Sequence, residues 1–420
     1  MPPYFNAVKI TDSVYWVGAI DWNVRNFHGY KTGRGTTYNA YLILADKITL
    51  IDTVKKGFFE EMLARIASVV DPGKIEYIIS NHAEPDHSGA LLQTIKTVKP
   101  AEVFASKMGV KALNAHYGAG LELTAAADGE ELDIGGKKIT FMETRMLHWP
   151  DSMFSYLQEE QILFTQDAFG MHLASGERFA DELPRELLER QAESYYANII
   201  TPFSPQVAKL LKKVEESGLT FNMVAPDHGP IWRSMEDFKR LLDLYKKWSN
   251  RELQPKVVIL YDTMWQATEK MSRVIEDGIR SAGVKVEPVN MSVCDRSEAA
   301  DKMLDAAALI VGSPTLNNHL LPSIADVLIY LKGLKFKTPY AAAFGSYGWS
   351  GEAVKQVKEY LEAMGSEILG EVKAQYTPGE EVLHACYELG RTAAEKVKAH
   401  FQCSMSNDSG EKLSKNVKSI

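Results

Sequence analysis

The sequence contains few cysteines and no apolar run long enough to cross a membrane. Only Cys294, Cys386 and Cys403 occur among its 420 residues, far apart and without a Cys-x-x-Cys pair. This usage excludes a disulfide framework and a cysteine-ligated iron module within the chain. The N-terminus has no charged leader followed by an apolar core, so it does not resemble a signal peptide. We therefore expect a cytoplasmic protein that does not span a membrane.

The sequence also lacks an excess of positive charge and a Gly-x-Gly-x-x-Gly dinucleotide fingerprint. Its net charge is -8 at pH 7 and its pI is near 5.8, which argues against a nucleic-acid-binding surface. A composition of 45% apolar and 24% charged residues is typical of globular proteins, and 420 residues suffice for two domains. The composition thus favours contacts with small molecules or with basic partners.

The densest group of potential metal ligands follows the apolar run 75–79. Residues 81–89 read Asn-His-Ala-Glu-Pro-Asp-His-Ser-Gly and supply His82, Glu84, Asp86 and His87. Two imidazoles and two carboxylates at the end of a strand favour a first-row transition metal over calcium or magnesium, whose preferred ligands are all oxygen atoms. The alternative is a polar loop with two solvated histidines, but the density of ligand types favours a metal site.

Three further potential ligands each follow a strand-like segment downstream. They are His148 after residues 138–143, Asp167 after residues 161–165, and His228 after residues 221–225. Taken singly, His148 or His228 could be an ordinary loop histidine, and Asp167 could be a helix N-cap. Together with the first group, they indicate one binuclear metal site with ligands from several strand ends.

The organisation of the chain changes near residue 250. An amphipathic segment ends there in a polar linker, and short apolar runs then alternate with helical patterns. Five strands with short connections predict a doubly wound parallel sheet of the flavodoxin type. We expect a metal-binding domain over 1–250, a flavodoxin-like domain over 255–400 and, from its composition, a disordered tail over 401–420. The predicted strands lie near 256–261, 284–289, 307–313, 338–345 and 368–375, and the predicted helices near 268–281, 297–305, 322–333, 351–364 and 380–400.

Such a sheet binds its ligand outside the carboxyl ends of its strands. The loops after the first, third and fourth predicted strands combine hydroxyl, amide and aromatic side chains, which suit a phosphate and a flavin ring. The alternative is that Thr263, Thr268 and Ser313 merely cap helices. Phosphate held by neutral groups favours FMN over a dinucleotide. The candidate FMN-binding residues are Thr263, Met264, Trp265, Gln266, Ala267, Thr268, Ser313, Pro314, Thr315, Leu316, Asn317, Asn318, Ser346, Tyr347, Gly348, Trp349, Ser350 and Gly351.

The order of the metal ligands resembles a known fold. His82-x-Glu84-x-Asp86-His87, followed by His148, Asp167 and His228, is similar to the metallo-β-lactamase fold, whose hydrolases carry His-x-His-x-Asp-His in the first motif. Glu84 stands where a hydrolase has its second histidine, and this departure is the mark of the flavodiiron proteins. Residues 18–22, 35–41, 145–152 and 344–351 extend the resemblance, which covers about residues 4–400. It implies an α/β chain with an N-terminal metallo-β-lactamase-like αββα sandwich and a C-terminal flavodoxin-like domain.

The resemblance implies an oxidoreductase in which FMN passes electrons to a non-haem diiron centre. Flavodiiron proteins reduce oxygen to water, nitric oxide to nitrous oxide, or both. Two electrons on FMN and two on a diferrous pair match the four that reduce one oxygen molecule to two waters. By resemblance, one iron, nearer the flavin, would be held by His82, Glu84 and His148, the other by Asp86, His87 and His228, with Asp167 bridging the two.

The resemblance also implies partners and two further site residues. His172 and Tyr195 resemble positions near the substrate pocket of the family, where a donor can protonate a bound oxygen species; the alternatives are a polar surface histidine and a core tyrosine. We expect a homodimer or a dimer of dimers, because the head-to-tail dimer of the family places the flavin of one subunit beside the diiron site of the other. The chain has no module for electron entry, so we expect a separate donor, rubredoxin or alternatively reduced deazaflavin F420.

Two other functions compete with this interpretation. One is a dizinc hydrolase fused to a flavodoxin-like domain, with the metal activating water. Glu84 argues against it, because a third carboxylate favours a hard ion that reaches the trivalent state. The other is an electron carrier with a purely structural first domain, which gives no reason to keep so many polar groups. The predicted phosphate loop departs from the flavodoxin pattern, because its usual glycine is missing and Trp265 and Gln266 stand inside it.

Overall fold

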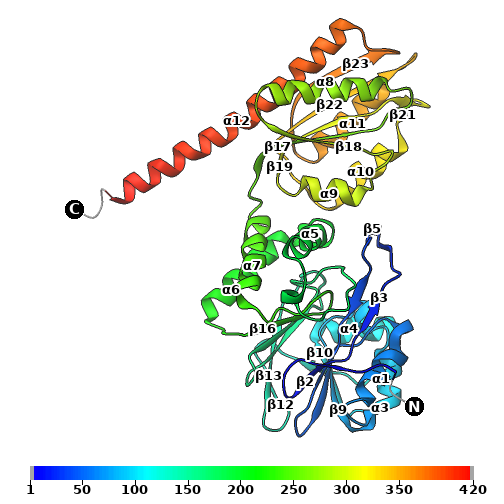
Figure 1. Ribbon diagram of the computed structural model, residues 1–420, viewed down its shortest axis with the longest axis vertical. Helices are drawn as coiled ribbons and strands as arrows, with labels where there is room; N and C mark the ends of the chain where they lie inside the picture. Colours follow the sequence, from blue (N-terminus) through cyan, green and yellow to red (C-terminus); the bar gives the residue numbers. More distant parts are fainter. Residues whose placement is uncertain (1–3, 417–420) are drawn as a thin grey trace. The chain divides into compact units, whose positions relative to one another are not determined.

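The computed structural model describes residues 4–416, without the side chains of residue 217 and of residues 403–416. The chain forms two compact units, which divide between Asn250 and Arg251 (Figure 1). The first unit contains two large sheets, and the second contains one large parallel sheet. Helices cover the sheets in both units.

Two sheets form the centre of the first unit. One has the strand order β1-β2-β7-β8-β9-β10-β11 and the other has the order β12-β13-β14-β15-β16. Large side chains from both sheets, such as Trp16, Tyr41 and Phe164, share one buried cluster, so the sheets pack face to face. The strands are β1 (Val8–Lys9), β2 (Val14–Trp16), β7 (Tyr41–Ile43), β8 (Ile48–Ile51), β9 (Ile75–Ser80), β10 (Glu102–Ser106), β11 (Thr124–Ala126), β12 (Glu131–Asp133), β13 (Lys138–Glu143), β14 (Met153–Leu157), β15 (Ile162–Gln166) and β16 (Met223–Pro226).

Helices cover the outer face of the first sheet. Phe59 of α1 and Leu113 of α4 share a buried cluster with Leu50 of β8. The neighbouring Ile51 belongs instead to the cluster between the sheets, because successive side chains of a strand point to opposite faces. The helices on this side are α1 (Phe59–Ala67), α3 (Leu91–Val98) and α4 (Lys107–Tyr117), with the short helices η1 (Lys56–Phe58), η2 (Pro72–Lys74) and α2 (Pro85–Ser88) between them.

Helices also cover the second sheet. Leu210 of α6 and Phe238 of α7 line an apolar hollow with Leu163 of β15. The first unit is therefore an αββα sandwich, as predicted. The helices here are α5 (Arg185–Tyr195), α6 (Ser204–Ser217) and α7 (Met235–Ser249), with η3 (Ala180–Glu182), the π-helix η4 (Tyr196–Ile200) and η5 (Thr201–Phe203). Two small antiparallel pairs, β3 (Ala19–Asp21) with β6 (Thr36–Tyr38) and β4 (Asn26–Phe27) with β5 (Tyr30–Lys31), stand apart from the two sheets.

The ends of the inner strands deliver the predicted metal ligands. β9 runs parallel to β8 and β10 and leads into α2, whose first residue, Pro85, keeps Glu84 extended (φ −60°, ψ 139°). In the second sheet β15 and β16 are parallel, so Asp167 and His228 leave it at the same edge. His148 lies in the connection from β13 to β14.

The second unit is a doubly wound parallel sheet with the order β18-β17-β19-β22-β23, the flavodoxin order. Helices α8 and α12 pack on one face and approach closely, because a side chain on Gly278 or Gly390 would meet the backbone of the other helix. The elements are β17 (Gln254–Tyr261), α8 (Ala267–Ser281), β18 (Lys285–Asn290), α9 (Arg296–Met303), β19 (Ala306–Gly312), β20 (Thr315–Leu316), β21 (His319–Leu320), α10 (Pro322–Gly333), β22 (Tyr340–Tyr347), α11 (Glu352–Ala363), β23 (Glu367–Gln375) and α12 (Glu380–Asn416).

The second unit differs from its predicted outline in three places. Ser346 and Tyr347 belong to β22 rather than to the following loop, because they continue the ladder with β23. The loop after β19 contains the small hairpin β20–β21. Over the predicted disordered tail, α12 continues to Asn416, and residues 417–420 lie outside the described part of the chain.

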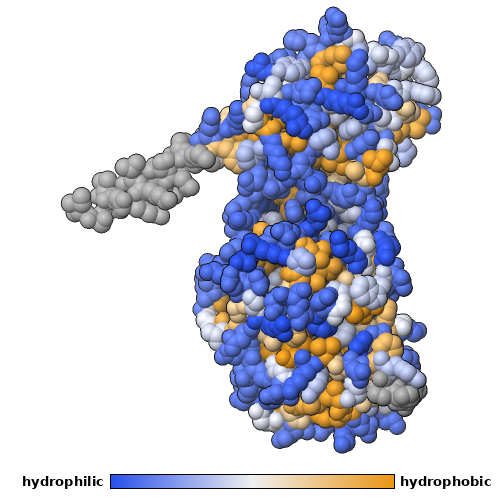
Figure 2. All heavy atoms as spheres, in the orientation of Figure 1, coloured by the Kyte–Doolittle hydropathy of each residue, from blue (hydrophilic) through white to orange (hydrophobic). Residues whose placement is uncertain are grey.

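The surface carries mostly polar side chains. Hydrophilic residues cover most of the visible face of each unit, with apolar patches between them (Figure 2). Among the described residues, no helix has the length and apolar character that crossing a membrane requires.

Candidate metal centre and flavin site

The structure gathers the seven predicted metal ligands into two adjoining sets. His82, Glu84, His148 and Asp167 form one set, and Asp86, His87 and His228 form the other. Within each set the potential ligand atoms lie within 4.8 Å of one another. Six of the seven side chains are buried, and His148 is partly exposed.

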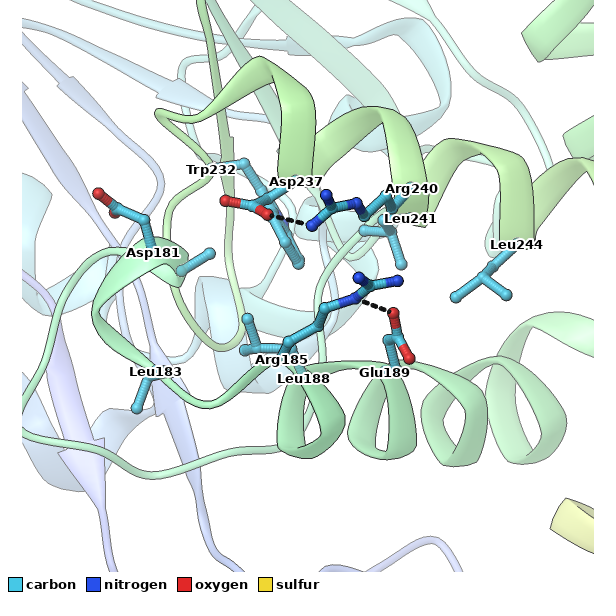
Figure 3. Close-up of a pocket in the computed structure, with 11 residues that line it drawn as sticks. Asp181, Leu183, Arg185, Leu188, Glu189, Trp232, Asp237, Arg240, Leu241 and Leu244 are labelled. Carbon is cyan, nitrogen blue, oxygen red and sulfur yellow. Dashed lines mark hydrogen bonds and ion pairs between the residues drawn. The ribbon is translucent and has the colours of Figure 1, made fainter.

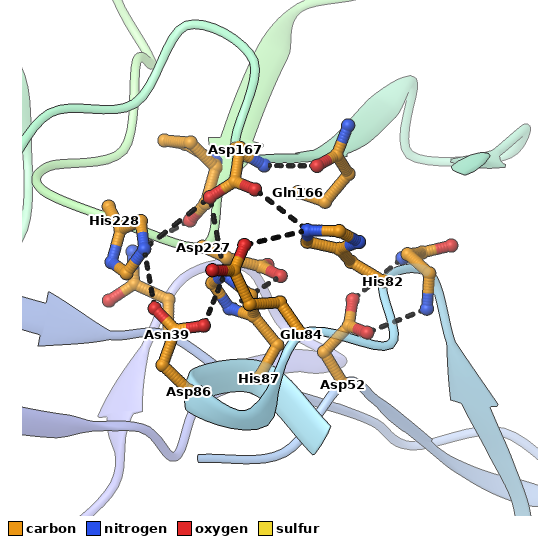
Figure 4. Close-up of polar contacts among 12 residues, drawn as sticks. Asn39, Asp52, His82, Glu84, Asp86, His87, Gln166, Asp167, Asp227 and His228 are labelled. Carbon is orange, nitrogen blue, oxygen red and sulfur yellow. Dashed lines mark hydrogen bonds and ion pairs between the residues drawn. The ribbon is translucent and has the colours of Figure 1, made fainter. Parts of the chain in front are cut away.

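Asp167 lies between the two sets and directs one carboxylate oxygen to each (Figure 4). Its Oδ2 atom is 3.2 Å from Nε2 of His82 and 3.0 Å from Nε2 of His148. Its Oδ1 atom is 3.2 Å from Nε2 of His87 and 3.4 Å from Nε2 of His228. This is the arrangement that a carboxylate bridging two cations requires.

The donor atoms fit a pair of transition-metal ions. Two ligand atoms that each lie about 2.1 Å from one ion, at a right angle, are about 3 Å apart, which matches the distances around Asp167. Both carboxylate oxygens of Asp86 are buried. Oδ2 lies 3.2 Å from Nε2 of His228, and Oδ1 lies 3.5 Å from Nε2 of His87. These spacings suit two ligand atoms on one ion, so the set with Asp86 also fits an ion.

The electrostatics of the site also favour cations. Burial alone would raise the pKa values of Glu84 and Asp167, but the surrounding histidines hold both well below their usual range. Burial alone would lower the pKa values of His87 and His148, but neighbouring carboxylates raise them to about 10 and about 9. Protonated histidines thus balance the buried carboxylates, and metal ions would replace these protons.

Three of the ligand histidines are oriented by hydrogen-bond or ion-pair partners that the sequence analysis missed. Nδ1 of His82 is 2.9 Å from Asp151, which also accepts a hydrogen bond from the backbone N–H of Ala83. Nδ1 of His87 is 3.3 Å from Asp227. Nδ1 of His228 lies 2.6 Å from the carbonyl oxygen of Thr37. These contacts leave the Nε2 atoms free to face the centre. The sequence does contain one indication of Asp151 and Asp227, because each stands within three residues of a predicted metal ligand.

His28 is another site residue that the sequence analysis missed. It lies in the turn between β4 and β5, in a left-handed conformation (φ 53°). Its Nε2 atom is 3.0 Å from Oε1 of Glu84, and this hydrogen bond raises the pKa of His28. The side chain is exposed. No motif surrounds His28 in the sequence, so only the fold brings it to the centre.

His172 and Tyr195 both lie beside the metal ligands. The hydroxyl of Tyr195 donates a hydrogen bond of 3.0 Å to Asp167, and Nδ1 of His172 lies 2.9 Å from the hydroxyl of Thr36. The ring of His172 is 4.7 Å from that of His228. Both residues are only 1% exposed, so the alternative of a surface histidine is wrong. Burial raises the pKa of Tyr195 and lowers the pKa of His172, so the phenol keeps its proton and the imidazole is neutral.

A cavity of about 440 Å³ opens at the carboxyl ends of β17, β19 and β22. Its lining includes thirteen of the predicted FMN-binding residues: Met264, Trp265, Ala267, Pro314, Thr315, Leu316, Asn317, Asn318, Ser346, Tyr347, Gly348, Trp349 and Ser350. Two further lining residues, Tyr376 and Thr377, follow β23 and were missed, because only the loops after three other strands were considered. Trp265 and Trp349 are 91% and 88% exposed, so both indole rings are free to stack on a ligand.

The other five predicted FMN-binding residues lie outside the lining of this cavity. Thr268 bonds Ser346 at 2.9 Å, Ser313 donates to the carbonyl oxygen of Pro314, and Gln266 lines a neighbouring polar hollow. Gly351 caps α11. The hydroxyl of Thr263 is buried without a hydrogen-bond partner among the described residues. That hydroxyl, in the loop between β17 and α8, fits a phosphate oxygen.

A separate hollow lies between α5 and α7 (Figure 3). Its two arginines, Arg185 and Arg240, are both paired with carboxylates of their own helices. The hollow contains none of the predicted site residues. It therefore adds nothing to the metal centre or to the flavin cavity.

Comparison with known proteins identifies relatives of both units. Residues 36–229 match the ODP family beta lactamase, and residues 259–390 match flavodoxin. The chain is 43% identical over 395 residues to a nitric oxide reductase of Moorella thermoacetica, covering 93% of this chain and 98% of that one. The solved rubredoxin oxygen:oxidoreductase from Desulfovibrio gigas has a TM-score of 0.91 and 42% identity, with coverage of 94% and 99%. The flavodiiron protein of Giardia intestinalis has a TM-score of 0.90 and 34% identity, with coverage of 95% and 98%.

Proposed function

This chain belongs to the flavodiiron protein family, and on that premise we propose that it reduces oxygen to water, nitric oxide to nitrous oxide, or both, with electrons that pass from FMN to a non-haem diiron centre. The observation that carries the proposal is Asp167, whose two oxygens face two separate ligand sets. Glu84 makes the first of these sets richer in carboxylate than a hydrolase would need.

The side chains of the two units hold the two cofactors. His82, Glu84 and His148 would hold one iron, Asp86, His87 and His228 would hold the other, and Asp167 would contribute one oxygen to each. In the second unit, the cavity lined by Trp265 and Trp349 would receive the flavin ring, and the hydroxyl of Thr263 would be available to the phosphate. When bound, the flavin and the iron pair supply the electrons for the reduction.

Tyr195 and His172 prepare the centre for proton transfer. Tyr195 holds its proton on the hydroxyl oxygen, because burial raises its pKa, and directs that proton to Asp167 at 3.0 Å. The phenol is thus a proton donor placed within reach of a substrate at the iron pair. His172 is neutral, and its Nε2 atom is buried without a hydrogen-bond partner among the described residues. That nitrogen is free to exchange a proton or a hydrogen bond with a substrate.

The hydrolase alternative is not supported. Relatives that match over most of the chain are named as reductases and oxidoreductases. A dizinc hydrolase also has no need of the flavin cavity in the second unit. Both observations favour redox chemistry over the activation of water.

We also propose an electron donor and an assembly for this chain. The sequence has no Cys-x-x-Cys pair and no dinucleotide fingerprint, so electrons come from a separate protein or coenzyme. We propose rubredoxin as the donor, with reduced deazaflavin F420 as the alternative. A head-to-tail homodimer, alone or as a dimer of dimers, brings the flavin of one subunit to the iron pair of another. We propose that the protein acts in the cytoplasm, where a buried thiol such as that of Cys386 stays reduced.

The proposal is tested by anaerobic reduction of the purified protein with rubredoxin, its reductase and NADH, followed by addition of oxygen or nitric oxide. We expect consumption of at least one of the two gases, with water or nitrous oxide as the product. Release of hydrogen peroxide in amounts equal to the oxygen consumed would contradict a four-electron reduction. Failure to consume either gas with a fully loaded protein would refute the proposed activity.

A further inference from the structure

His148 differs from the other three ligand histidines in how its ring is oriented. His82, His87 and His228 each direct Nδ1 to a carboxylate or a carbonyl oxygen. In the part of the chain that the structure describes, Nδ1 of His148 makes no hydrogen bond, while its Nε2 atom faces Asp167 and Glu84. The orientation of His148 therefore depends on the backbone that carries it.

That backbone lies in the connection from β13 to β14. Asp151, at the far end of this connection, is tied to Ala83 and Ser106. Nearer to His148, the backbone is closed by hydrogen bonds within the connection, from Leu147 to Thr144 and from Met146 to Trp149. Within the described residues, one hydrogen bond joins the backbone of residues 145–150 to a part of the chain beyond this connection. It runs from Nε2 of Gln166 to the carbonyl oxygen of Leu147, over 2.7 Å.

Gln166 uses both ends of its side-chain amide. The amide nitrogen donates to Leu147, the residue before His148, and the amide oxygen accepts a hydrogen bond of 2.7 Å from the backbone N–H of Asp167. Figure 4 shows the second of these bonds. The side chain is fully buried, and the backbone is left-handed (φ 43°), a conformation that persists in a non-glycine residue where its surroundings hold it.

We propose that Gln166 is a positioning residue that keeps His148 in the metal centre by fixing the loop of His148 against the backbone of Asp167. This inference rests on the proposed metal centre. The ion held by His82, Glu84 and His148 depends on the amide of Gln166. The ion held by Asp86, His87 and His228 does not, because Nδ1 of His228 faces the carbonyl oxygen of Thr37 and Nδ1 of His87 lies 3.3 Å from Asp227, and neither contact involves Gln166.

Replacing Gln166 with glutamate tests this role, because glutamate has nearly the same shape but differs in charge and in the hydrogen bonds it can donate. In Gln166→Glu, the carboxylate still accepts from the N–H of Asp167 but has no hydrogen to donate to the carbonyl oxygen of Leu147. Two oxygens then face each other in a buried place, and the loop moves away. Loss of partners that orient a metal ligand typically lowers metal affinity about 10- to 100-fold, and we expect this change for one ion only.

The experiment is a titration of the metal-free, full-length protein with Co²⁺ alone, followed by calorimetry and visible absorption. The wild type should bind two ions per chain, one in each ligand set. Gln166→Glu should bind one ion with wild-type affinity and the second about 10- to 100-fold more weakly. The matched control is Gln161→Glu at the start of the same hairpin strand, where a partly exposed glutamine also has a left-handed backbone (φ 53°). The control should bind both ions as the wild type does.

Combined variants identify the affected ion. In a His148→Ala background, Gln166→Glu should leave the affinity of the remaining ion unchanged, because both changes act on the same ion. In a His228→Ala background, it should weaken the remaining ion. Equal weakening of both ions, wild-type affinity for both, or an additive effect with His148→Ala would overturn the inference.

Two measurements separate this inference from other failures. Circular dichroism checks that Gln166→Glu is folded. If Gln166→Glu does not fold, Gln166→Met takes its place in the titration, because it removes both hydrogen-bonding groups without adding charge. Failure of the wild type to reduce oxygen or nitric oxide would refute the proposed function. The cobalt titration would still test Gln166, because it requires only the two ligand sets.

Discussion

Replacing Glu84 with histidine tests the residue that distinguishes this centre from a hydrolase. Glu84 is buried, and its carboxylate oxygens lie 3.2 Å from Nε2 of His82 and of His148 and 3.0 Å from Nε2 of His28. These contacts hold the pKa of Glu84 well below its usual range, although burial opposes them, so the side chain is ionised at neutral pH. The substitution Glu84→His thus removes one negative charge and keeps a ligand of similar reach.

The size of the effect follows from that charge. The ligand atoms of the set lie within 4.8 Å of one another, so a bound ion lies closer than that to Glu84. One unit charge at about 4 Å and an effective dielectric constant of about 20 contributes about 4 kcal/mol. For a one-electron couple this corresponds to about 170 mV. We expect the ferric state to lose this stabilisation, the potential to rise, and zinc to compete better for the site.

The assay combines metal analysis with a redox titration followed by electron paramagnetic resonance. Glu84→His should lose gas reduction and gain zinc, and it should keep its flavin because the flavin cavity lies in the other unit. Glu84→Gln removes the charge without supplying an imidazole and should lose iron. Glu76→His, at an exposed position of the same strand, is the control and should behave as the wild type. If Glu84→His retains two irons and near-normal turnover, Glu84 does not determine the chemistry.

Three further predictions concern the proton donor, the flavin and the assembly. Tyr195→Phe should keep both irons but lower turnover about 100- to 10,000-fold, as expected of a general acid; unchanged turnover would remove Tyr195 from the mechanism. Thr263→Val should weaken FMN binding by about 1 kcal/mol or more, measured by flavin fluorescence, because the phosphate loses a hydrogen bond from the buried hydroxyl. The control Thr97→Val, on the surface of α3, should not change FMN binding. Mixed subunits lacking either FMN or iron should complement each other, and full activity in a verified monomer would argue against this.

The structure brings the seven predicted ligands together, and the sequence could indicate this because several of them closely follow a strand. His82, Asp167 and His228 follow β9, β15 and β16, and the edge of a sheet brings the ends of its strands together. The regular alternation of the second unit likewise predicts its strands to within a few residues, as for β18 at Lys285–Asn290. In both cases the local sequence determines the secondary-structure element, and the element determines where its residues lie in the fold.

The partners that orient the ligands could not be predicted in this way. Asp151 meets His82 across 69 positions of the chain, and its sequence context resembles that of any polar loop residue. Gln166 stands just after the strand-like residues 161–165 and was not predicted to have a role, because its role depends on a left-handed backbone and on the loop of His148. His28 reaches Glu84 through the hairpin β4–β5, which has no sequence signature. These contacts arise from tertiary packing, so they require the fold.

The central claim is that one chain holds a flavin and an iron pair, and the metal and flavin content of the purified protein tests it most directly. The two ligand sets and the flavin cavity predict about two irons and about one FMN per chain, with the absorption spectrum of an oxidised flavin. Two zinc ions without flavin, together with hydrolysis of a thioester or a lactam, would contradict the account in favour of the hydrolase.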